Sequence, residues 1–288
     1  MVERITDHGL LEARNDPSLG PQLAILLSEG KGEFLLPPRI QEYFAFRRKY
    51  ADKLGPKGDS AKGEIEIVDN PLEILAAEKT AAQRLINRGL PEDEAIKRVQ
   101  VGVRAEDQWG AKICDAVKFP GGAFGTYVRD ISWGKLETGT VGVAILPQLE
   151  DGRFVLTKAF RHATRDSVLE IPRGGMDVGA SIINTIKREL REEGGVELVV
   201  DPVDLGQYTP DSGILESRVP LYHAKVKITG KEIPEETEAI GGLVLMTKGQ
   251  LAEALKEGKY TDSEGKTYDL TDGFSQTAFK KAQDLELI

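Results

Sequence analysis

The chain has 288 residues, with 38 Lys or Arg and 47 Asp or Glu, which gives a formal net charge of -9 at pH 7. Hydrophobic residues make up 40% and charged residues 30%, as in globular proteins that bury a sizeable core in one large domain or two. The acidic balance argues against non-specific nucleic-acid binding, the single cysteine, Cys114, excludes an intrachain disulfide, and no apolar run is long enough to span a membrane. Without a signal pattern at the N-terminus, the expected location is the cytoplasm.

The first part of the chain, residues 1–117, is interpreted as an N-terminal extension that contains a helical pair. The first helix is expected to begin after the N-cap Asn70 and to stop at Gly89. A second helix should start at Pro91 and reach about Asp107. The pair carries no chemical motif, so its expected role is a cap or an interface.

From Lys118 onward the pattern changes to mixed strands and helices without a strict βαβ repeat, and we predict a second domain over residues 118–288. A hairpin is predicted from the strands 140–146 and 153–160 around the turn at Asp151-Gly152. The remaining predicted elements are a strand at 168–171, a helix at 181–193, strands at 220–228 and 242–246, a helix at 247–258 and a last helix at 274–285.

The predicted helix at 181–193 places three acids on one face, because Glu189, Glu192 and Glu193 are three to four residues apart. That face borders the apolar stripe of the same helix, so the carboxylates should lie at the edge of the core. Gly194-Gly195 ends the helix, and anions in its last turns oppose the helix dipole at a cost of roughly 0.3–1 kcal/mol each.

A divalent cation would reverse the sign of these costs. Carboxylate oxygens at this spacing suit Mg²⁺ or Mn²⁺, and the preceding glycines at Gly174-Gly175 let a backbone carbonyl approach the same ion. The alternative is a solvated charged face, the usual fate of such runs, in which Arg188 compensates part of the charge.

The residues around this helix resemble the signature of the Nudix hydrolase family, G-x5-E-x7-R-E-U-x-E-E-x-G-U, where U is a bulky aliphatic residue. The matching positions are Gly174, Arg188, Glu189, Leu190, Glu192, Glu193, Gly195 and Val196. The first Glu of the signature is replaced by Ala180.

The resemblance implies a Nudix-type α/β/α sandwich around a mixed β-sheet and hydrolysis of a nucleoside diphosphate linked to another group. By position, Glu189 and Glu193 correspond to the principal metal ligands, Glu192 shares a second ion and acts in catalysis, and Gly174 supplies a carbonyl. Arg188 corresponds to an orienting residue. Ala180 removes the usual partner of this arginine, and Asp177 is a candidate replacement.

Three further segments, residues 157–175, 208–224 and 234–240, are similar to ADP-ribose and nucleotide-sugar pyrophosphatases. By this resemblance Arg161 contacts a substrate phosphate, Glu216 matches a substrate-binding acid, and Glu236 or Glu238 supplies or positions a catalytic base. The alternatives are a surface arginine, a Glu216 that caps or pairs with Arg218, and a solvated acidic loop.

The expected reaction is therefore Mg²⁺- or Mn²⁺-dependent hydrolysis of a small nucleotide, with ADP-ribose giving AMP and ribose 5-phosphate. Other Nudix activities on nucleotide sugars, dinucleotides or nucleoside triphosphates are alternatives. Ala180 and the N-terminal extension also keep open a non-hydrolytic nucleotide sensor. Analogy with the subfamily suggests a homodimer.

Overall fold

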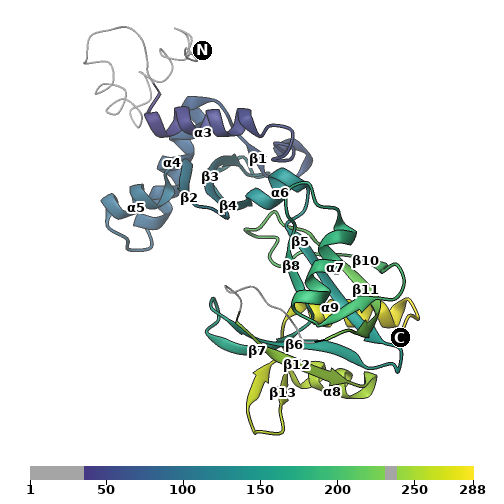
Figure 1. Cartoon of the computed structure of the whole chain (residues 1–288). Helices are drawn as coiled ribbons and strands as arrows, with labels where there is room; N and C mark the ends of the chain where they lie inside the picture. Colours follow the sequence, from purple (N-terminus) through teal and green to yellow (C-terminus); the bar gives the residue numbers. More distant parts are fainter. Residues whose placement is uncertain (1–35, 231–238) are drawn as a thin grey trace, which may run out of the picture. The chain divides into compact units, whose positions relative to one another are not determined.

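The computed structural model describes residues 36–230 and 239–288, and it divides the chain into two compact units, Met1–Ile131 and Ser132–Ile288 (Figure 1). The division falls later than the boundary expected between residues 117 and 118. The reason is that strand β4 (Phe124–Ser132) pairs with strand β3 (Gly110–Lys118) and so belongs to the first unit.

Over residues 36–131, the first unit combines three helices with a four-stranded sheet in the order β1-β3-β2, with β4 also on β3. Its other elements are α3 (Pro38–Lys49), a 3₁₀ turn (Ser60–Lys62), β1 (Glu66–Ile67), α4 (Pro71–Ile86), α5 (Glu92–Val99) and β2 (Gly102–Glu106). The predicted helical pair is present as α4 and α5, and the side chain of Asn70 caps α4 by accepting a hydrogen bond from the Leu72 backbone N–H.

The second predicted helix was too long. Helix α5 ends at Val99, and the backbone of Gln100 is already extended (φ -57°, ψ 128°). The chain then forms β2, which pairs antiparallel with β3 from Gly102 to Glu106. Pairing with a neighbouring strand therefore overrides the helical pattern that the sequence suggests up to Asp107. The sheet buries Cys114, and burial raises the pKa of this thiol to about 11.

The second unit has a ten-stranded mixed sheet in the order β10-β11-β5-β6-β7-β14-β13, with β8, β9 and β12 pairing β5, β11 and β6. Its strands are β5 (Gly142–Leu149), β6 (Phe154–Arg161), β7 (Asp166–Glu170), β8 (Arg173–Gly175), β9 (Val196–Leu198), β10 (Val203–Tyr208), β11 (Val219–Ile228), β12 (Ile240–Met246), β13 (Lys259–Thr261) and β14 (Thr267–Asp269). Its helices are α6 (Trp133–Thr138), α7 (Ile182–Glu192), α8 (Lys248–Glu257) and α9 (Gly273–Asp284).

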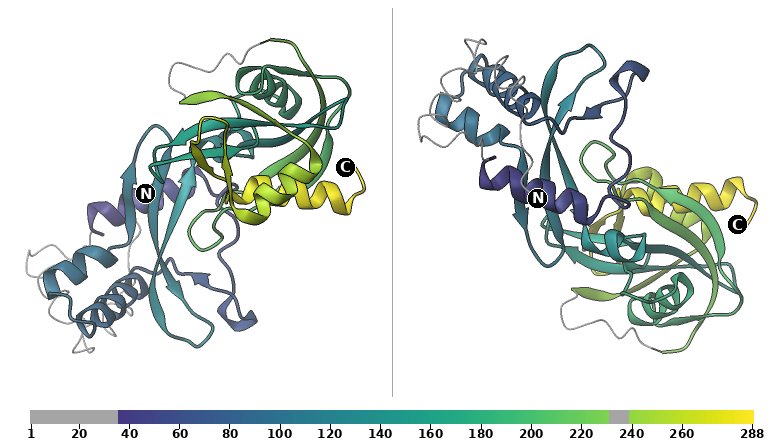
Figure 2. Two further views of the ribbon diagram at one scale, coloured as in Figure 1. Left: turned by 90° about the horizontal axis from the view of Figure 1, so that it is seen from below. Right: turned by 90° about the horizontal axis from the view of Figure 1, so that it is seen from above.

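Helices cover both faces of this sheet (Figure 2). Successive side chains of a strand point to opposite faces. Accordingly, Val143 and Ile145 of β5 pack in the cluster that contains α7. Ala144 and Leu146 pack in the cluster that contains α8 and α9. The expected α/β/α sandwich around a mixed sheet is confirmed.

The predicted hairpin at 140–160 is present only at its turn. Strands β5 and β6 share a single paired position, Gln148 with Phe154. Beyond that point β5 pairs in parallel with β11, from Ala144 opposite Leu221 onward, and antiparallel with β8. Because β5 pairs with these strands, it is a central strand with every residue buried. In the described ranges, no helix is long and apolar enough to cross a membrane.

Candidate active site

Helix α7 carries the glutamate cluster, and its local sequence explains its position. The side chain of Ser181 caps the helix by accepting from the Asn184 N–H at 3.3 Å. Ile186 and Leu190 are fully buried against the sheet. A β-carbon at Gly194 would lie 2.7 Å from the Leu190 carbonyl oxygen, so the tight stop after the acids requires glycine.

Glu189 lies against the backbone of Gly174. The glutamate is only 1% exposed, and a β-carbon at Gly174 would meet its Oε1 at 2.0 Å. Strand β8 is fixed in this position by pairing with β5, with Gly174 opposite Val143. The structure thus brings together two of the residues that the sequence assigned to the metal site.

Glu193 closes the same corner of the site from the end of α7. Its side chain is 4% exposed, and Oε2 accepts a hydrogen bond from the Arg173 backbone N–H at 2.9 Å. Its backbone carbonyl accepts from the hydroxyl of Thr157 on β6 at 3.3 Å. Two buried carboxylates, one helical turn apart, therefore face the β8 loop.

Arg188 joins the acids to that loop. Its guanidinium lies 2.6 Å from Glu189 Oε1 and 2.9 Å from Glu192 Oε2, and it donates to the Gly175 carbonyl oxygen at 2.7 Å. Burial would lower the pKa of Arg188, but the charges of Glu189 and Glu192 outweigh it and raise that pKa above its usual value. These contacts fit the orienting role expected for this arginine.

Asp177, the candidate replacement for the partner that Ala180 removes, forms a loose ion pair with Arg188. Its Oδ2 lies 3.5 Å from Nε of Arg188. Asp177 is largely exposed, so this ion pair contributes little stability by itself. Arg188 is nevertheless anchored, because its remaining nitrogens are held by Glu189, Glu192 and Gly175.

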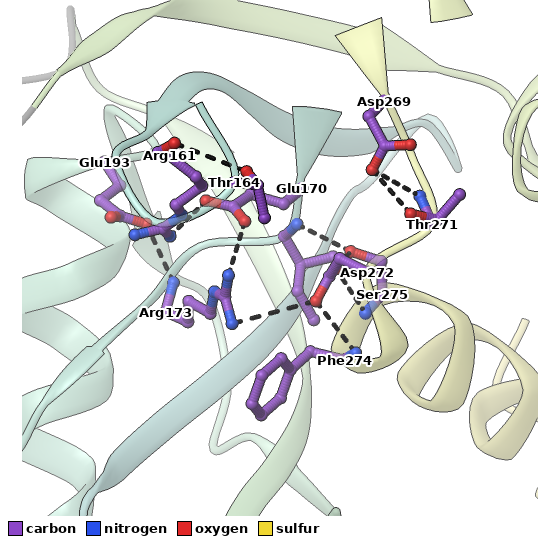
Figure 3. Close-up of polar contacts among 11 residues, drawn as sticks. Arg161, Thr164, Glu170, Arg173, Glu193, Asp269, Thr271, Asp272, Phe274 and Ser275 are labelled. Carbon is purple, nitrogen blue, oxygen red and sulfur yellow. Dashed lines mark hydrogen bonds and ion pairs between the residues drawn. The ribbon is translucent and has the colours of Figure 1, made fainter. Parts of the chain in front are cut away.

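A second polar network lies next to Glu193, around Arg161 at the end of β6 (Figure 3). Glu170, which is 2% exposed at the end of β7, accepts from Arg161 through Oε1 and from Arg173 through Oε2, the latter at 2.8 Å. Burial would lower the pKa of Arg161, and the neighbouring carboxylate of Glu170 more than offsets this effect and raises it. The Arg161 side chain is thus fixed in position by its ion pair with Glu170.

Comparison with known proteins identifies the fold around these residues. The family model of the NUDIX domain matches residues 138–265. The chain contains a Nudix domain. The match confirms the Nudix hydrolase class that the sequence predicts.

A solved structure described as an ADP compounds hydrolase is similar to this chain, with a TM-score of 0.52 and 19% sequence identity. The alignment covers 65% of this chain and 91% of that chain. At this identity the likeness concerns the fold. No curated protein matches the chain.

Glu216 of the Nudix domain lies on the loop between β10 and β11, and its surroundings differ from those expected. Its carboxylate pairs with Lys135 of α6 at 3.1 Å, and its side chain is 11% exposed. The alternative expected from the sequence, a pair with Arg218, is not among the ion pairs of the described residues. Its substrate-binding role remains a prediction.

Glu170 and Arg173 belong to the site but were not predicted from the sequence. Both lie in the segment EIPRGG, which was interpreted only as the strand and turn that lead into the signature. The contact of buried Glu170 with both Arg161 and Arg173 could not be predicted from residue spacing along the chain. Strand pairing brings the three together, since Glu170 is opposite Thr157 in the β6–β7 register.

The predicted metal ligands are not all brought to one point. In the part of the chain that the structure describes, no three His, Cys, Asp or Glu side chains are grouped as a metal ion would require. Glu192 instead faces Arg188. Glu236 and Glu238 lie outside the described residues. The ligand and base assignments therefore remain predictions.

Proposed function

We propose that the chain hydrolyses a diphosphate linkage in a nucleoside diphosphate derivative, with ADP-ribose as the leading substrate and AMP and ribose 5-phosphate as products. The observation that carries the proposal is the pair of buried carboxylates, Glu189 and Glu193, held against the β8 loop. Burying two carboxylates is unfavourable unless cationic groups compensate them. The fold supports the same conclusion.

The oxygen donors proposed as ligands suit Mg²⁺ or Mn²⁺ by their chemistry. Hard divalent cations take carboxylate and carbonyl oxygens, and Glu189 lies so close to Gly174 that a β-carbon there would overlap its carboxylate. We propose that Glu189 and Glu193 are the principal ligands, with Glu192 and the Gly174 carbonyl in support. When bound, the cation would neutralise charge on the diphosphate and lower the pKa of a water molecule.

The residues of the chain would perform the other parts of the reaction. Arg161 would bind a phosphate oxygen by charge-assisted hydrogen bonds, and Arg188 would keep Glu189 and Glu192 in place. Glu236 or Glu238 would accept the proton of the attacking water. A bond forms between the water oxygen and one phosphorus, and the bond from that phosphorus to the bridging oxygen breaks.

The choice of ADP-ribose rests on the sequence segments around Arg161 and Glu216 and on the name of the similar structure, an ADP compounds hydrolase. Nucleotide sugars, dinucleotides and nucleoside triphosphates are the alternative substrates. The anchored Arg188 favours hydrolysis over a non-hydrolytic sensor, because Glu189, Glu192 and Gly175 hold this arginine without the glutamate that Ala180 replaces. A cytoplasmic location and a homodimer form part of the same proposal.

The proposal is tested by Glu193→Gln in assays of ADP-ribose hydrolysis with Mg²⁺ and with Mn²⁺. Loss of a ligand charge should lower kcat/KM by on the order of 100-fold or more. Glu197→Gln is the matched control, because Glu197 is an exposed acid just after the helix, and it should keep the parent rate. A Glu193→Gln variant as active as the control would contradict the metal-ligand role.

A further inference from the structure

We propose that Arg173 is a second phosphate-binding arginine, held beside Arg161 by Glu170 as a positioning residue. The pair would bind the diphosphate group of the substrate, so this inference rests on the proposed function. Neither Arg173 nor Glu170 belongs to the Nudix signature. Together these two residues contact β6, α7 and the N-terminus of α9.

The buried carboxylate of Glu170 is shared between the guanidinium groups of Arg161 and Arg173. The Glu170 side chain is 3% exposed, and each oxygen accepts from a different guanidinium: Oε1 from Arg161 and Oε2 from Arg173. In Figure 3 both guanidinium groups point to this carboxylate. The charges of Glu193 and Asp272 also act on Arg161, so the two arginines lie among three carboxylates and are held in place by them.

In the part of the chain that the structure describes, each of the two arginines has one N–H donor without an acceptor. Nε of Arg161 and Nε of Arg173 are both buried, and neither has a hydrogen-bond partner among the described residues. A buried donor without a partner costs roughly 1–3 kcal/mol, more on a charged group. The two Nε atoms are closed to solvent, but the side chains as a whole are 39% and 26% exposed, so an anion would approach other parts of the two guanidinium groups.

The other neighbours of Arg173 fix the orientation of its guanidinium group but do not accept a hydrogen bond from its Nε. Asp272 lies 3.9 Å from Nη1, but its carboxylate already accepts from the backbone N–H groups of Phe274 and Ser275 as the N-cap of α9. The guanidinium also stacks on the Phe274 ring, 4.6 Å from its centroid. Arg173 is therefore fixed in direction by β7 and α9 while retaining free hydrogen-bonding capacity.

Arg173 also lies close to the acidic residues of α7. The backbone N–H of Arg173 donates to Glu193 Oε2 at 2.9 Å, while its side chain reaches Glu170. One residue thus connects the proposed metal ligand to the arginine pair. The proposed phosphate site at the Arg173 side chain therefore adjoins the proposed metal ligand Glu193. Guanidinium forks match phosphate oxygens bidentately, which lysine cannot reproduce.

The test compares Arg173→Lys, Glu170→Gln and the double variant in the full-length chain. The control is Arg153→Lys, because Arg153 also donates to a carboxylate, that of Asp151, but in an exposed pair just before β6. Two measurements are made: kcat and KM for ADP-ribose with Mg²⁺, and the Kd of its α,β-methylene analogue, which cannot be hydrolysed at the bridge. Circular dichroism reports folding.

Arg173→Lys should raise KM and Kd about tenfold, with kcat within about threefold of the parent. Glu170→Gln should have a similar effect on Kd. The double variant should resemble Arg173→Lys alone, because Glu170 acts through the arginine. A merely structural network would change thermal stability and leave Kd at the parent value.

The proposal is overturned if Arg173→Lys binds the analogue within twofold of the Arg153→Lys control, or if the two single effects multiply in the double variant. If Glu170→Gln does not fold, the Kd of Arg173→Lys alone decides. If the parent hydrolyses ADP-ribose and the variants keep its KM and Kd, only the proposal of a phosphate-binding arginine pair is overturned. A parent that binds without turnover overturns the proposed reaction, while the Kd comparison still decides on the pair. A parent that neither hydrolyses nor binds overturns both.

Discussion

Gly174 and Glu189 occupy adjoining space so closely that the first position accepts no side chain. A β-carbon on residue 174 would lie 2.0 Å from Oε1 and 2.3 Å from Oε2 of the glutamate. The neighbouring glycine is different, since a β-carbon at Gly175 would meet nothing closer than the Val141 carbonyl oxygen at 4.0 Å. The two adjacent glycines therefore provide an internal comparison.

Gly174→Ala should displace the Glu189 carboxylate, lower the free energy of unfolding by about 1–3 kcal/mol, and reduce ADP-ribose hydrolysis at least tenfold. Gly175→Ala should leave both quantities near their parent values. Urea unfolding and steady-state kinetics on the two variants check this. Equal activity of the two alanine variants would show that the position of Glu189 is not needed for the reaction.

Single residues of the site were predictable where the chemistry is local in sequence. Glu189 and Glu193 share a helix face whatever the tertiary structure, so helical spacing alone places them together. Glu170 and Arg161 are different, because they meet only after β6 and β7 pair. The ion pair of Glu216 with Lys135 likewise depends on a loop meeting α6, which no local pattern encodes.

At the scale of elements, α7 is held at its C-terminal end by Arg188. Arg188→Gln should lower the free energy of unfolding by about 1–3 kcal/mol, because it removes charged hydrogen bonds to Glu192 and Gly175 and leaves acids at the unfavourable end of the helix dipole. Arg191→Gln on the exposed side of the same helix should change it by less than about 0.5 kcal/mol. Urea denaturation of both variants without metal decides, and equal losses would contradict the anchoring role.

The elements that the sequence predicted well are those with their own start and stop signals. Helix α8, predicted at 247–258, has a capping box between Thr247 and Gln250, and Gly258 ends it in the left-handed conformation. The short strands β8, β9, β13 and β14 were missed, because segments of three residues have no periodicity to detect. The four-stranded sheet of the first unit was missed since residues 102–106 resemble the end of a helix.

At the scale of the whole molecule, the two units have separate cores. Every predicted site residue that the structure describes lies in Ser132–Ile288. In the first unit, the buried Asp115 accepts from Tyr43 Oη and from Arg129 Nε. Each unit therefore offers an independent means of changing its stability.

Scanning calorimetry should show two transitions. Mg²⁺ with the α,β-methylene analogue at about 100 times its Kd should stabilise the second unit by about 2.7 kcal/mol and raise only its transition. Asp115→Asn should lower only the other transition, because it leaves Arg129 partly buried without its carboxylate. A single transition that responds to both changes would contradict this division.

The parallel pairing of β5 with β11 has a consequence for protein synthesis. Strand β5 is completed at Leu149, but its partner extends from Val219 to Ile228, so the central strand waits for several seconds of translation. During that interval both apolar faces of β5 lack a neighbour on one side, and α7 has no finished sheet to cover. The nascent second unit therefore exposes apolar strand surface of the kind that chaperones bind, whereas the described strands of the first unit are all synthesised before β5.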